Sequence, residues 1–68
     1  MNAAEIQGLA HTHPHELAVS FQKALVDFGY AGLDLKDVKD AIKSYLDGGK
    51  PSGVIQMFVH RWMKEGTE

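Results

Sequence analysis

Three histidines at alternate positions are the residues of this sequence whose types most suggest chemistry. His11, His13 and His15 form a His-x-His-x-His run, and neutral imidazoles bind zinc, nickel and copper well. A protein metal site needs three or four converging ligands, however, and Pro14 interrupts the local geometry of the run. We therefore predict no metal site and no cofactor, and we interpret the run as an exposed segment in front of a helix.

Residues that could catalyse a reaction are sparse elsewhere in the chain. Only one further histidine, His60, stands apart from the run, there is no cysteine, and neither G-x-S-x-G nor H-E-x-x-H occurs. The stretch 48–52 lacks the glycine spacing of a phosphate-binding loop, and it has Pro51 where the following helix should begin. We predict that the protein is not an enzyme and has no small-molecule substrate.

The length of 68 residues predicts a single domain over residues 1–68. A chain this short buries only about 60% of its unfolded surface. Its core supplies ~3–5 kcal/mol, so oligomerisation is common at this size. No apolar run exceeds three residues, and the first residues lack the basic and apolar regions of a signal peptide. We expect a cytoplasmic protein with no membrane partner.

Helical spacing of apolar residues organises the whole chain. It predicts a short helix at about residues 3–10 and longer helices at about 14–28, 35–47 and 53–65. Asn2, Asp34 and Ser52 are the expected N-caps, and Gly29 is an expected C-cap. No stretch shows the alternation of a strand beside a turn. The predicted fold class is therefore all-α: a small three-helix bundle, with a short N-terminal helix that either docks on it or frays.

The last predicted helix is more apolar than one buried face requires. Its apolar residues cover roughly 240° of the helical wheel and leave a narrow polar ridge of Gln56, His60 and Lys64. Met57 and Met63 lie at the two margins of the apolar band. Contiguous exposed apolar surface usually marks an interface, so the margins are covered either by the N-terminal segment or by a second chain.

The helix over residues 14–28 carries a thinner second apolar stripe, which also needs a partner. Together the two surfaces predict a protein–protein interaction module. The predicted interface residues are Val19, Val26, Tyr30, Met57, Trp62 and Met63. Methionine adapts its shape and tryptophan anchors interfaces. We expect either a homodimer or a small regulatory or accessory protein that binds a larger partner.

A helix-turn-helix nucleic-acid-binding protein is the alternative function, with the last two predicted helices as its parts. The predicted contacts are Lys50, Ser52, Gln56, His60, Arg61 and Lys64. A net charge of −2 argues mildly against this alternative. The apolar character of the last helix and the long connection before it argue against it further.

Overall fold

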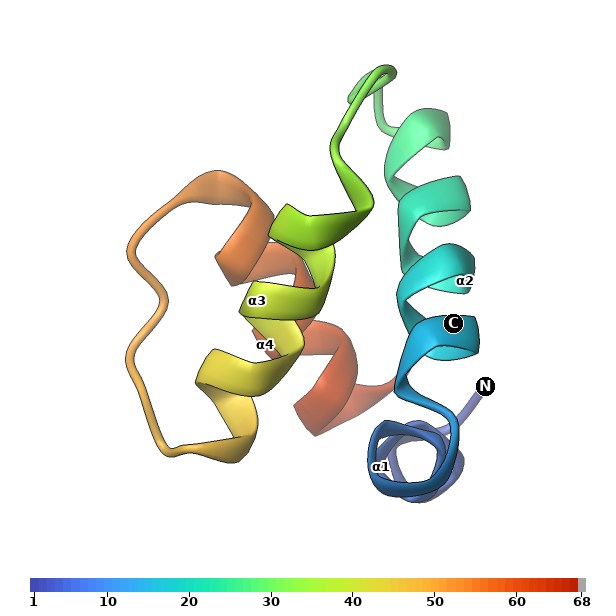
Figure 1. Cartoon of the computed structure of the whole chain (residues 1–68), viewed down its shortest axis with the longest axis vertical. Helices are drawn as coiled ribbons and strands as arrows, with labels where there is room; N and C mark the ends of the chain where they lie inside the picture. The colour runs from blue at the N-terminus through green and yellow to red at the C-terminus, as the bar shows by residue number, and fades with distance from the viewer. Residues whose placement is uncertain (68) are drawn as a thin grey trace.

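The computed structural model describes residues 1–67, and within them it contains four α-helices and no strand. The helices are α1 (Ala3–Thr12), α2 (Pro14–Asp27), α3 (Leu35–Leu46) and α4 (Val54–Glu65). Helix α3 packs against α2 and α4, and α1 runs across the end of α2, where it contacts both α2 and α4 (Figure 1). The predicted all-helical class is confirmed, and each predicted boundary lies within two residues of the observed one.

The helix ends follow local capping rules in part. The Oδ1 atom of Asn2 accepts a hydrogen bond of 2.8 Å from the Glu5 amide, as predicted for an N-cap. Gly29 ends α2 with φ of 92°, a conformation that favours glycine. Asp34 and Ser52, in contrast, make no side-chain cap. The N-cap of α4 is Gly53. Ser52 instead donates hydrogen bonds from its backbone amide and its hydroxyl to the Oε1 atom of Gln56.

The core draws side chains from all four helices. Its centre includes an aromatic contact between α2 and α4, where the rings of Phe21 and Trp62 lie 5.0 Å apart. The buried apolar residues are Ile6, Ala10, Leu17, Ala18, Phe21, Leu25, Val38, Ala41, Ile42, Val59, Trp62 and Met63. Because α1 contributes two of these residues, it is a docked part of the fold and does not fray as an independent segment.

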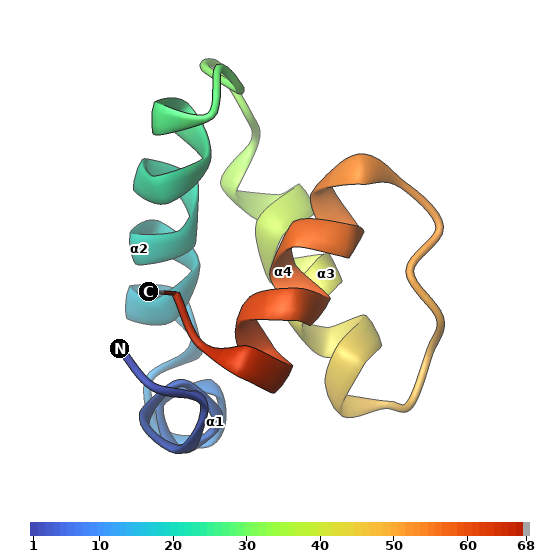
Figure 2. The same cartoon turned by 180° about the vertical axis from the view of Figure 1, so that it is seen from behind.

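Helix α1 covers one margin of the apolar band on α4. Ile6 and Met63 are both fully buried, and the Gln7 side-chain amide donates a 3.0 Å bond to the Met63 carbonyl oxygen. The two ends of the described chain also meet (Figures 1 and 2), since the Thr67 amide donates to the Met1 carbonyl oxygen at 3.0 Å. Gly66 permits this approach, because a Cβ there would lie 2.9 Å from that oxygen.

Two residues predicted to form an interface therefore belong to the core. Met63 is fully buried and Trp62 is only 6% exposed. Met63 lies against α1, the N-terminal segment that was predicted as one of two possible covers for this margin. Trp62 is buried because it packs against Phe21 of α2. No helix in residues 1–67 combines the length and the apolar character needed to cross a membrane.

We predict that Ile6→Ala destabilises the whole domain. Ile6 is fully buried, and truncation of such a side chain costs about 2–5 kcal/mol, comparable with the ~3–5 kcal/mol that a core of this size supplies. Thermal unfolding followed by circular dichroism should show a large fall in Tm. Leu9→Ala, at a partly buried position of the same helix, is the control and should cost less. A wild-type melt for Ile6→Ala would show that α1 is outside the cooperative unit.

Candidate functional site

The exposed side of α4 is not the polar ridge that the sequence suggested. Gln56 and His60 are half-buried, whereas Val54, Met57 and Arg61 are exposed. Figure 2 shows α4 in front of α3, with one side free of other helices. The cause is the position of α1 and α3, which together hold α4 in a rotation that directs part of its polar ridge toward the α3–α4 loop.

This free side carries a continuous surface of apolar side chains together with one arginine. We call this surface the α4 patch and define it by Phe28, Val54, Met57, Phe58 and Arg61. Phe28, Val54 and Met57 are 59%, 51% and 60% exposed. The ring of Phe28, at the end of α2, lies 5.0 Å from that of Phe58 on α4. Aromatic pairs at such separations attract each other beyond their buried area, so the two helices fix this part of the patch.

Two shallow hollows show that the patch is continuous. The first, of about 260 Å³, is lined by Val54, Met57, Phe58 and Arg61. The second, of about 290 Å³, lies toward the end of α4 and is lined by Phe28, Phe58, Arg61, Trp62, Gly66 and Thr67. Phe58 and Arg61 line both hollows. Scattered exposed apolar residues are ordinary, and the side chains of this patch differ from them in being contiguous.

Four other residues were predicted to form an interface. Met57 is part of the α4 patch and Tyr30 lies beside it, whereas Val19 and Val26 lie elsewhere on α2. The Tyr30 ring lies 5.8 Å from Phe58, at the edge of the patch. Val26 is 48% exposed, but helical periodicity places it about 160° around α2 from Phe28. Val19 shares that far side of α2 and is half-buried.

Sequence reasoning missed Phe28 and Val54. Phe28 continues the three- and four-residue spacing of the buried stripe of α2, and such spacing is typical of a buried position. The glycine at position 29 was the available signal, because a C-cap places Phe28 outside the last helical turn. Val54 lies in the first turn of α4, where few other elements reach it, and its exposure follows from the bowed loop before it (Figure 1).

Most of the residues predicted to contact nucleic acid do not form a free basic surface. The Gln56 side chain is bonded to Ser52, and His60 packs edge-on against Tyr45, with ring centroids 5.3 Å apart. The Nε atom of Arg61 lies 3.2 Å from the Glu65 carboxylate. Lys50 and Lys64 are exposed, as is Ser52. Three exposed cationic side chains remain on this part of the molecule, those of Lys50, Lys64 and Arg61, and Arg61 is paired with Glu65.

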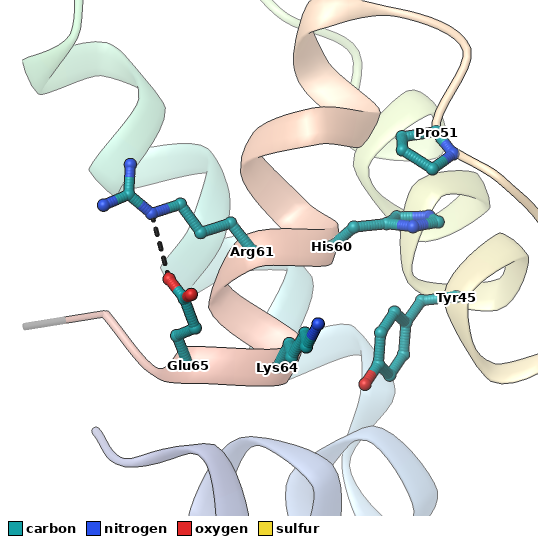
Figure 3. Close-up of a pocket in the computed structure, with 6 residues that line it drawn as sticks. All are labelled: Tyr45, Pro51, His60, Arg61, Lys64 and Glu65. Carbon is teal, nitrogen blue, oxygen red and sulfur yellow. Dashed lines mark hydrogen bonds and ion pairs between the residues drawn. The ribbon is translucent and has the colours of Figure 1, made fainter.

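A third concavity, of about 480 Å³, lies on the α3 side of α4, and its lining residues are Tyr45, Pro51, His60, Arg61, Lys64 and Glu65 (Figure 3). His60 lies between Pro51 and Tyr45, while Arg61 and Glu65 point to the other side of the helix. The Nε2 atom of His60 is buried and has no hydrogen-bond partner among the described residues. A buried polar atom without a partner is destabilising.

The three N-terminal histidines are all exposed, at the junction of α1 and α2. The Nδ1 atom of His13 lies 3.0 Å from the Thr12 hydroxyl, which occupies that nitrogen. Within residues 1–67, no three or more His, Cys, Asp or Glu side chains gather closely enough to hold a metal ion.

Comparisons with known proteins add no family to this geometry. The chain matches no protein-family model, no curated protein and no solved structure.

We predict that His60→Phe stabilises the protein. Phenylalanine keeps the edge-on contact with Tyr45 and removes the unpartnered Nε2 atom, whose burial costs about 1–3 kcal/mol when nothing pairs with it. Each 1 kcal/mol corresponds to a Tm rise of about 4–8 °C in a domain of this size. His15→Phe, at an exposed position, serves as the control and should give no rise. An unchanged or lower Tm for His60→Phe would mean that Nε2 is satisfied in solution.

Proposed function

We propose that this protein is a non-catalytic protein–protein interaction module and that the α4 patch is its binding surface. In this function it acts by associating with itself or as a small regulatory or accessory protein on a larger partner. The observation that carries the proposal is the continuous exposed surface formed by Phe28, Val54, Met57 and Phe58.

The composition of the patch supports this function. Interfaces place apolar, aromatic and methionine side chains at the centre and charged groups at the rim. Here Met57 and Phe58 lie at the centre, and the exposed pair formed by Arg61 and Glu65 lies beside them. The methionine can adapt to a partner's shape, and arginine is common among residues that dominate binding.

The rigidity of the patch also favours binding. Phe58 contacts both Phe28 and Tyr30 as well as the buried Trp62, at centroid distances between 5.0 and 5.8 Å. Side chains already held by neighbours lose less conformational freedom when a partner docks. The aromatic part of the surface is thus already packed in the unbound protein, on two helices that both contribute to the core.

A neighbouring hollow extends the available surface beyond the patch. It has a volume of about 360 Å³ and is lined by Tyr30, Leu33, Asp37, Ser52, Gly53, Val54, Ile55 and Gln56. Val54 belongs to both surfaces. A partner could therefore contact the start of α4 and the α2–α3 loop together. The α4 patch and this hollow together still have fewer residues than the roughly 20–30 that each partner contributes to a standard interface. This small size favours transient association.

We predict that Met57→Glu abolishes binding through the patch. Glutamate is a good helix former, and Met57 is 60% exposed, so the domain should stay folded while a charge enters the apolar centre. The measurement is affinity capture from a lysate of the native host, with wild-type and variant proteins as parallel baits and with the same chain counted among the captured proteins.

The matched control is Val26→Glu, which places the same charge at a 48% exposed apolar position on the far side of α2. The expected result is a set of proteins retained by wild type and by Val26→Glu but lost with Met57→Glu. Equal Tm values for the two variants ensure that folding does not explain the difference. Identical capture by all three baits would contradict the proposal.

A further inference from the structure

We propose that Met57 is an oxidation site, and that a peroxide switches the α4 patch from apolar to polar by converting the Met57 thioether to the sulfoxide. Control of binding by this reaction rests on the proposed function, whereas the site of the reaction does not. Two observations point to Met57: the unequal exposure of the three methionines and the place of Met57 at the centre of the patch.

The three methionines differ sharply in their access to a dissolved oxidant. Met63 is fully buried. Met1 packs partly against the core, and its carbonyl oxygen is bonded to the Thr67 amide. Met57 is 60% exposed and lines an open hollow of about 260 Å³. Because a peroxide must touch the sulfur atom to react, the folded chain offers the Met57 thioether first, and Met63 reacts only when the core opens.

The reaction needs a hydroperoxide as its only co-reactant. A lone pair of the thioether sulfur attacks one peroxide oxygen, so a sulfur–oxygen bond forms while the oxygen–oxygen bond breaks. The other oxygen takes up the proton and leaves as water, or as an alcohol when the oxidant is an organic hydroperoxide. The sulfur loses two electrons and the peroxide gains them. The product is methionine sulfoxide, a polar and chiral side chain.

The sulfoxide changes the centre of the α4 patch without disturbing the core. A partner that covers Met57 would then have to bury a polar group, which is unfavourable unless that group is hydrogen-bonded. Arg61 lies one helical turn after Met57 and lines the same hollow. Its Nε atom donates to Glu65, and its other guanidinium N–H groups can donate to a sulfoxide oxygen four residues away. The domain should therefore stay folded after oxidation.

Exposure also makes the change reversible. Methionine sulfoxide reductases, one type for each sulfoxide epimer, restore the thioether. The sulfur–oxygen bond breaks, the oxygen leaves as water, and a thiol supplies the two electrons. A sulfoxide on the open side of α4 is accessible to such an enzyme in the folded protein. The same lesion at Met63 would place a polar group in the core and disrupt it.

The first test reads the order of oxidation from peptide masses after brief treatment with dilute hydrogen peroxide. Trypsin separates the three methionines into peptides 1–23, 44–61 and 62–64, because Lys50 precedes a proline and is not cleaved. Peptide 44–61 should gain an oxygen atom first, and peptide 62–64 should gain it at least ~100-fold more slowly, since it must wait for the core to open. Equal rates for peptide 44–61 and either of the others would overturn the site.

The second test measures apolar surface as retention on a phenyl hydrophobic-interaction column. Wild type should elute earlier in step with oxidation of peptide 44–61, with an unchanged Tm, and reductases of both types with dithiothreitol should restore its retention. Met57→Leu keeps Met1 and Met63 but has no thioether in the patch, so peroxide should not shift its elution from that of its own untreated form. An equal shift in Met57→Leu, or no earlier elution of wild type, would overturn the switch.

Affinity capture from a lysate freed of thiols separates this switch from the function that it controls. Oxidised wild type should lose the proteins that Met57→Glu loses and Val26→Glu retains, and treatment of the bait with the reductases should restore them. If oxidised wild type still captures those proteins, the switch is overturned and the proposed function stands. If Met57→Glu loses none, the proposed function fails and control of binding fails with it, while the peptide masses still decide the oxidation site.

Discussion

The packing of Ile6 against the side of α4 that carries Met63 is the constraint on which the exposed surface of this protein depends. A helix can bury only part of its circumference against its neighbours. Because α1 and α3 occupy two sides of α4, the rotation of α4 is fixed, and the side with Val54 and Met57 meets water. The α4 patch is therefore a consequence of where the N-terminal helix docks, and its apolar residues are exposed although they are as hydrophobic as those of the core.

Phe28 joins this surface through a separate cause. Helix α2 ends at Asp27 because Gly29 adopts a left-handed conformation and turns the chain. The side chain just before the turn then lies over α4, where it stacks on Phe58. A local backbone rule and a long-range packing constraint thus place two phenylalanines from different helices side by side. The apolar surface is larger than either helix alone would provide.

The helices and their ends were predictable from the sequence, because local periodicity and glycine caps determine them. The rotation of α4 was not. With apolar residues over roughly 240° of the wheel, several rotations bury a similar area, so the pattern alone could not assign Trp62 and Met63 to the core or Val54 to the surface. The sequence also predicted an exposed polar ridge on α4 that the structure does not have. Gln56 contacts Ser52 in the α3–α4 loop and His60 contacts Tyr45 of α3, and these contacts between distant segments cannot be seen in the helical pattern of α4.

The junction of the chain ends has a consequence for local unfolding. Met1 and Thr67 are joined by hydrogen bonds from the Thr67 amide and from the N-terminal amine, and Gln7 is bonded to Met63 in the next turn inward. Helix α1 therefore cannot lift away without breaking its hydrogen bonds to the end of α4. Such an opening exposes Ile6 and Met63 together. The molecule thus holds a second apolar surface in reserve, on the opposite side of α4 from the one it already presents.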